Sequence, residues 1–215
     1  MITGIILAAG NSSRYQAKKP KQFSLFNDRM IIDYSISTFL NHKNIDDIII
    51  VVPEEYHELI QDKYSDFKVI VGGKKRQESS FIGLLNCNKK TTQVLIHDAA
   101  RAMITPRIID RCLKSLDKFD GVAPALPLVN TLAFVDSKNN IINIPDRKKY
   151  YELQTPQCFK YKTILNCFNK LNDDVTDDIS VLIKMGYECT LVKGSKLNMK
   201  ITTLDDIKIL SELNE

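Results

Sequence analysis

Residues 48–52 form an uninterrupted run of β-branched side chains, Ile-Ile-Ile-Val-Val, which ends at Pro53. A strand of this composition is apolar on both faces, as is typical of a parallel strand covered by helices on either side. The run therefore predicts a sheet buried between two layers of helices. A half-exposed antiparallel sheet would show alternating polar residues instead.

Segments with helical spacing of apolar residues alternate with further strand-like runs. The predicted order is strand 5–8, helix 31–40, strand 48–52, helix 54–64, strand 68–71, helix 76–85 and strand 94–98. This alternation indicates an α/β fold with a doubly wound, mostly parallel, Rossmann-like sheet. Because the carboxyl ends of parallel strands share one edge, we expect Gly10, Gly72–Gly73 and Asp98 to line one crevice.

The pattern changes at Gly121, after which no helix separates the strand-like pieces. Short strands are expected at 122–126, 128–135 and 141–144, with a turn at 136–140, and they indicate a β-arm that protrudes from the sheet at about residues 129–153. Helices are expected again at 160–171 and 177–185, strands at 189–192 and 199–201, and a last helix from Leu204. We interpret residues 1–215 as a single domain carrying this arm.

The composition restricts the class of function. A net charge of +4 over 215 residues favours small anionic substrates and points neither to nucleic acid nor to a membrane surface. Since no apolar stretch approaches the roughly 20 residues of a membrane span, we expect a cytoplasmic protein. The five cysteines contain no Cys-x-x-Cys pair, which argues against a disulfide framework or a zinc site.

The loop after the first strand contains Gly, Asn and two Ser together with several cations, among them Arg14 and Lys21. Free backbone N–H groups surrounded by cations suit a polyphosphate. An ordinary surface turn with solvated lysines fits the composition equally well. A Walker A loop and a Gly-x-Gly-x-x-Gly fingerprint are both missing, since Ser12 and Tyr15 stand where the fingerprint needs glycine.

Leu-Ala-Ala-Gly-x-x-x-Arg at residues 7–14, followed by Pro-Lys-Gln at residues 20–22, resembles the signature of sugar-phosphate nucleotidylyltransferases. The Pro-Lys-Gln ending is similar to the 2-C-methyl-D-erythritol 4-phosphate cytidylyltransferase family, which has a close relative in ribitol-5-phosphate cytidylyltransferase. The resemblance implies an enzyme that joins CMP from CTP to a polyol phosphate and releases pyrophosphate. It also implies Mg²⁺ as cofactor and a homodimer that exchanges its arms.

The resemblance further implies roles for individual residues. The catalytic residues would be Arg14, Lys21 and Lys200. CTP would be bound by Ala8, Ala9, Gly10, Gly72, Gly73 and Ser79. The acceptor would be bound by Asp98, Arg101, Thr131, Arg147, Thr155 and Thr176, with Asp98 also a potential metal ligand.

The sequence departs from the family pattern at three positions, where Lys74 replaces Asp, Ala102 replaces Pro and Asn130 replaces Asp. Several functional motifs also have structural explanations that stay open. Ser79 begins a helix, Asp98 and Arg101 fit a local ion pair, and Thr176 fits a helix cap.

Two functions from other classes are weaker hypotheses. A nicotinamide-dependent oxidoreductase lacks its glycine fingerprint. An RNA-binding module would need aromatic residues between its basic runs, and only Tyr15 and Phe23 come near them. Among acceptors, Asp-Ala-Ala-Arg at residues 98–101 and Thr-Asp-Asp at 176–178 favour 2-C-methyl-D-erythritol 4-phosphate over ribitol 5-phosphate by resemblance.

Overall fold

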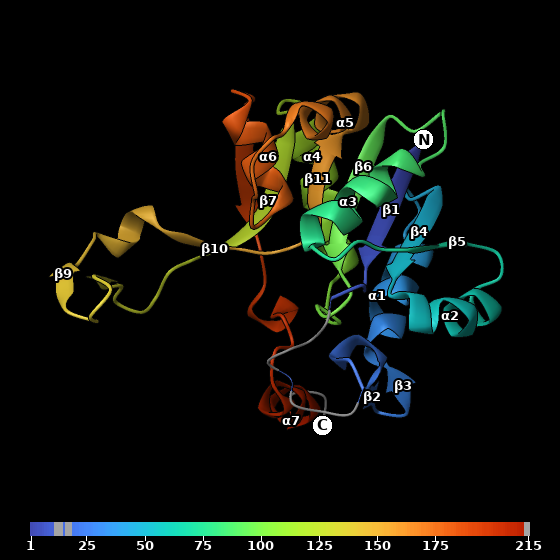
Figure 1. Ribbon diagram of the computed structural model, residues 1–215, viewed down its shortest axis with the longest axis horizontal. Coiled ribbons are helices and arrows are strands. Elements are labelled where there is room, and N and C mark those ends of the chain that lie inside the picture. Colours follow the sequence, from blue (N-terminus) through green and yellow to red (C-terminus); the bar gives the residue numbers. More distant parts are fainter. Residues whose placement is uncertain (11–14, 16–18, 213–215) are drawn as a thin grey trace.

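The computed structural model describes residues 1–10, Tyr15 and residues 19–212. Its centre is an eight-stranded sheet with helices on both faces (Figure 1). The strands of this sheet are β1 Ile2–Leu7, β4 Asp47–Val52, β5 Lys68–Val71, β6 Gln93–Asp98, β7 Gly121–Pro127, β10 Tyr151–Leu153, β11 Gln157–Lys160 and β12 Cys189–Lys193.

The strand order is β7-β11-β6-β1-β4-β5; β10 pairs with the same edge of β7 as β11 does, and β12 pairs with the other edge of β7. Strands β6, β1, β4 and β5 are neighbours and run parallel. Only β10 and β11 run against the other strands. The sheet is thus mostly parallel and doubly wound, as the sequence predicts.

Helices cover the sheet on both faces because the residues of each buried strand point alternately to opposite sides. Ile6 packs with α1, α2 and α4, whereas Ile5 and Leu7 pack with α3, α5 and α6. The helices are α1 Ile31–Leu40, α2 His57–Lys63, α3 Arg76–Leu85, α4 Pro106–Leu116, α5 Tyr161–Lys170, α6 Asp178–Lys184 and α7 Leu204–Glu212. Leu210 of α7 belongs to a third apolar cluster together with Tyr15.

The structure corrects three expectations. The strand expected at 199–201 is absent, because this segment follows the 3-10 helix η4, Lys196–Asn198, and makes only an isolated backbone bond from Ile201 N to the Ala100 oxygen (2.9 Å). Residues 122–126, expected as a strand off the main sheet, form part of β7 within it, and of the strand expected at 128–135 only Phe134–Val135 is a strand. Helix α4 and strand β11 were not predicted at all.

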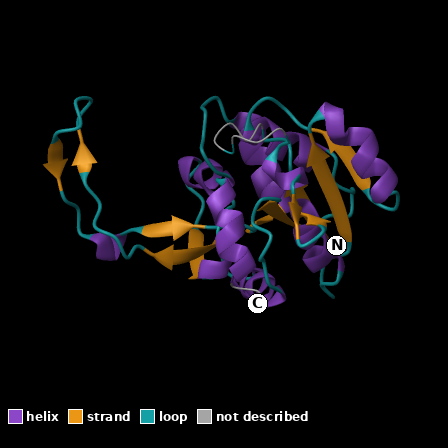
Figure 2. Ribbon diagram, turned by 90° about the horizontal axis from the view of Figure 1, so that it is seen from below, coloured by secondary structure: helices purple, strands orange, loops and turns teal. Residues whose placement is uncertain are grey.

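The arm leaves the sheet after β7 and returns with β10, and both views show it extending away from the sheet and its helices (Figures 1 and 2). It contains a two-stranded sheet of β8 Phe134–Val135 and β9 Ile141–Asn143, followed by the 3-10 helix η3, Arg147–Lys149. Phe134 and Ile141 are each 65% exposed. The arm therefore presents apolar side chains that its own chain does not cover.

Candidate active site

A cleft lies at the carboxyl edge of the parallel strands. Its walls come from the ends of β1 and β6, the start of α3, the 3-10 helix η1, Lys21–Phe23, and the segment before α7. The described residues that line it are Leu7, Ala8, Ala9, Gly10, Lys21, Gln22, Gly73, Lys74, Lys75, Arg76, Ser79, Asp98, Ala100, Lys200 and Thr202. Five of these carry a positive charge and one is a carboxylate, so the cleft suits a polyanion.

The glycine pair sits directly after β5, where the backbone passes close to the end of β1. A Cβ atom at Gly72 would lie 2.5 Å from the Ala9 Cβ and 2.8 Å from Ser79 Oγ, so only glycine fits there. Gly73 N donates a hydrogen bond to Ser79 Oγ (3.1 Å), and Lys74 N donates to the Glu78 carboxylate (2.8 Å). The first turn of α3 therefore holds the glycine loop in shape.

The end of β1 is held from the other side by the Pro-Lys-Gln motif. The amide of Gln22 donates to the carbonyl oxygens of Ala8 (2.6 Å) and Gly10 (3.0 Å) and is almost fully buried. Lys21 precedes it at the wall of the cleft. Arg14, the other catalytic residue predicted in this loop, lies outside the described residues.

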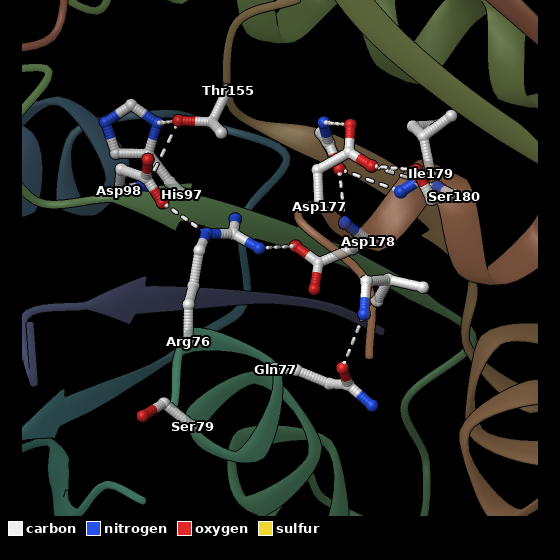
Figure 3. A network of polar contacts seen from close by, with 12 residues as sticks. Arg76, Gln77, Ser79, His97, Asp98, Thr155, Asp177, Asp178, Ile179 and Ser180 are labelled. Carbon is white, nitrogen blue, oxygen red and sulfur yellow. Dashed lines mark hydrogen bonds and ion pairs between the residues drawn. The ribbon is translucent and has the colours of Figure 1, made fainter. Parts of the chain in front are cut away.

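Asp98 at the end of β6 is the centre of the charge network. Its Oδ1 atom pairs with Arg76 Nε at 3.0 Å (Figure 3), and its Oδ2 atom pairs with Lys200 Nζ at 2.6 Å. Burial disfavours its charge, but Arg76 and Lys200 outweigh burial and hold the pKa of Asp98 well below its usual range. The pairing with Arg101 that the motif suggested does not form, because Arg101 donates instead to backbone oxygens of Asn198 and Leu153.

Behind Asp98, His97 and Thr155 form a buried polar pair. Thr155 Oγ1 accepts a hydrogen bond from the backbone N–H of Asp98 (3.0 Å) and lies 3.0 Å from His97 Nδ1 (Figure 3). Burial lowers the pKa of His97 to about 3, so its imidazole is neutral at physiological pH. The contacts of the Thr155 hydroxyl orient the end of β6, and its side chain is not part of the cleft wall.

The remaining predicted acceptor residues are not brought into the cleft. Thr131 and Arg147 lie on the exposed arm, where Arg147 Nη1 donates to the Val129 oxygen at 2.6 Å. Thr176 is exposed, just before α6. The cap of α6 is its neighbour Asp177, whose carboxylate accepts from Ser180 N.

Three residues with clear roles in the site's shape were not predicted as site residues. Arg76 and Gln22 line the cleft, and Glu78 holds the glycine loop. The signal for Gln22 was present in the Pro-Lys-Gln motif, and that for Glu78 was its position three residues after Lys75, at the start of a helix. Arg76 gave no local signal, because its partners are 22 and 102 positions away.

A family model described as "IspD: 2-C-methyl-D-erythritol 4-phosphate cytidylyltransferase" matches residues 2–213. The chain belongs to the IspD family. A 2-C-methyl-D-erythritol 4-phosphate cytidylyltransferase of Clostridium botulinum (strain 657 / Type Ba4) is 39% identical to it over 97% of this chain and 94% of the relative.

The chain is also similar to a bifunctional protein and to a solved structure. A bifunctional ribulose 5-phosphate reductase/CDP-ribitol pyrophosphorylase Bcs1 of Haemophilus influenzae is 37% identical over 98% of this chain, which covers 47% of that protein. The crystal structure of 4-diphosphocytidyl-2C-methyl-D-erythritol synthase from Anaerococcus prevotii DSM 20548 superimposes with a TM-score of 0.88 at 26% identity, covering 100% and 96% of the two chains. As an IspD family member the chain is a nucleotidyltransferase.

Within the described residues, no helix combines the length and apolar character that crossing a membrane requires. The same part of the chain holds no cluster of three or more His, Cys, Asp or Glu side chains able to bind a metal.

Proposed function

We propose that this IspD family chain transfers CMP from CTP to 2-C-methyl-D-erythritol 4-phosphate and releases pyrophosphate, a step in isoprenoid precursor synthesis. The observation that carries this proposal is the cleft at the carboxyl edge of the sheet, whose described lining carries five cations and one carboxylate. Because its glycines have no side chains, the loop after β5 would let a flat base approach the backbone closely. Lys21 and Lys200, which both line the cleft, would then contact the triphosphate and the acceptor phosphate.

The chemistry needs little from the protein beyond positioning and charge. An oxygen of the acceptor phosphate attacks the α-phosphorus of CTP, a new P–O bond forms, and the bond to the leaving pyrophosphate breaks. The second pKa of a phosphate monoester is about 6, so the acceptor is already a nucleophile at neutral pH. His97 is neutral and buried away from the cleft wall, which agrees with a mechanism that has no general base.

Mg²⁺ is part of the proposal because it neutralises the charge of the triphosphate. This ion is usually held by substrate phosphates, water and one or two carboxylates. Asp98 is the carboxylate among the described cleft residues and would be its ligand. Both its oxygens already accept from Arg76 and Lys200, so we expect the triphosphate to supply most of the coordination.

Chelation of the metal is therefore expected to abolish pyrophosphate release, and added Mg²⁺ should restore it. Because the protein would contribute few ligands, the metal should leave by dialysis without lowering the melting temperature. Turnover that persists in excess chelator would contradict the role of Mg²⁺.

The substrates can be tested by measuring pyrophosphate release with each of CTP, UTP, ATP and GTP against 2-C-methyl-D-erythritol 4-phosphate and ribitol 5-phosphate. We expect turnover with CTP far above the other nucleotides, because the glycine loop and Ser79 would recognise cytosine. Equal rates with UTP would overturn the cytidine assignment, and Lys74 would be the first residue to replace with aspartate. The Haemophilus influenzae relative makes ribitol 5-phosphate the second candidate acceptor.

The arm points to a homodimer. Apolar side chains on short strands are a liability in a monomer and are normally covered by another chain. Phe134, Ile141, Ile142 and Ile144 are all more than half exposed. We propose that two chains exchange arms and that Arg147 of each completes the acceptor site of the other.

A cytoplasmic location belongs to the same proposal. All five cysteines carry free thiols, the state that the reducing cytoplasm maintains.

A further inference from the structure

Arg76, the first residue of α3, lies between two buried carboxylates. Its Nε atom pairs with Asp98 at 3.0 Å, and its Nη1 atom pairs with Asp178 at 2.8 Å (Figure 3). The Asp98 and Asp178 side chains are 10% and 1% exposed. A planar guanidinium can serve two carboxylates at once, which the single ammonium group of a lysine does less well.

The two carboxylates come from different elements, and of the two only Asp98 lines the cleft. Asp98 ends β6 and also pairs with Lys200. Asp178 begins α6, two residues after Thr176. Arg76 itself follows the glycine loop, so one side chain connects the nucleotide end of the cleft with both elements of the proposed acceptor end.

The neighbouring residue strengthens the same connection. The Gln77 amide donates to the Asp173 oxygen at 3.1 Å, and its oxygen accepts from Val175 N at 2.9 Å. The first turn of α3 thus holds the segment that leads into α6. Among the described residues Asp178 has no ion-pair partner other than Arg76, so loss of Arg76 would leave a buried charge uncompensated.

We propose that Arg76 is a positioning residue of the transfer reaction, which orients Asp98 and with it Lys200 relative to the start of α6. The acceptor end of the cleft is thereby assembled on the helix that also shapes the nucleotide end. The predicted effect of Arg76 on catalysis rests on the proposed function, whereas its ion pairs with Asp98 and Asp178 do not. Arg76 acts through Asp98 and Asp178 and is not assigned a contact with the reacting atoms.

The test compares Arg76→Met with the double variant Arg76→Met/Asp178→Asn. The single variant should lower the melting temperature, because Asp178 stays buried without its partner. The double variant removes that orphan charge and should regain most of the melting temperature. Its kcat/KM for the acceptor should nevertheless stay about 10²-fold low, the cost of misplaced reacting groups, while KM for CTP changes little.

Two results would overturn the proposal. Recovery of turnover together with the melting temperature in the double variant would make Arg76 merely a counter-ion of Asp178. A rise in KM for CTP as large as the loss towards the acceptor would make it a nucleotide-binding residue. Arg76→Lys keeps the positive charge and provides a second test if Arg76→Met does not fold. It should keep most of the melting temperature but have a lowered kcat/KM for the acceptor.

A matched control is Lys63→Met, since Lys63 pairs at 2.6 Å with the buried Asp33, between α1 and α2 and outside the cleft lining. It should lower stability and leave both KM values and kcat unchanged. A double-mutant cycle of unfolding with Arg76→Met and Asp98→Asn gives a readout independent of activity. The effects of the two substitutions on the free energy of unfolding are expected to be non-additive, and strictly additive effects would refute the pairing. This readout does not depend on turnover. A wild-type chain that turned over no substrate would refute only the proposed function.

Discussion

Replacing Lys21 with alanine is expected to lower kcat by about 10²–10³-fold, the usual cost of removing one electrostatic donor from an active site. KM for CTP should rise far less, because the charge of Lys21 would matter most as negative charge grows on the α-phosphate in the transition state. Two unit charges about 4 Å apart interact by roughly 4 kcal/mol at an effective dielectric near 20, so one lysine is sufficient for an effect of this size. Pyrophosphate release under saturating CTP measures it.

The fold should survive this substitution. The backbone of η1 is held by hydrogen bonds from Phe23 N to the Pro20 oxygen and from Ser24 N to the Lys21 oxygen, which alanine keeps. Lys114→Ala removes the same charge from the exposed surface of α4 and should leave kcat within about two-fold, as surface changes usually do. A Lys21→Ala protein with nearly full kcat would show that this lysine has no catalytic role.

Mixing an Arg147→Ala protein with a Lys21→Ala protein should restore activity to about a quarter of the wild-type level, if two chains exchange arms in a symmetric dimer. Random pairing makes half of the dimers mixed. In each mixed dimer one site combines the intact Lys21 of one chain with the intact Arg147 of the other. Neither parent protein can form such a site.

The matched control places both substitutions on one chain. This double variant, mixed with either single variant, can form no intact site and should remain inactive. Subunit exchange must be verified by mass before activities are compared. A monomer in sedimentation, or an exchanged mixture no more active than its parents, would show that each chain completes its site alone.

Local patterns predicted those parts of the fold in which neighbouring residues determine the structure. The bounds of β5 and α3 agree with the expected ranges 68–71 and 76–85, because apolar spacing and flanking glycines mark both. Helix α4 also carried a signal, with Thr105 before Pro106 at its first position, that was not used. Strand β11 carried none, since its four residues are a strand only through pairing with β6 and β7.

The candidate site likewise contains residues that local patterns could predict and contacts that they could not. Residues at strand ends, such as Gly10 and Asp98, could be placed from the order of strands alone. Lys200 was expected to need an anion, and it finds one in Asp98, 102 positions earlier in the chain. The link from Asp98 through Arg76 to Asp178 depends on side chains from three separate elements, and no sequence pattern encodes which of them meet.

Strand β10 has a consequence for how two copies of the chain could meet. It pairs with the second half of β7, at the same edge where β11 pairs with the first half, so the base of the arm is a continuation of the central sheet. A slip of one residue in this pairing would turn each side chain of β10 to the other face. The direction of the arm is therefore set by the pairing of the exposed strand β10 with β7, and in the proposed dimer the symmetry axis would follow from this hydrogen-bond register within a single chain.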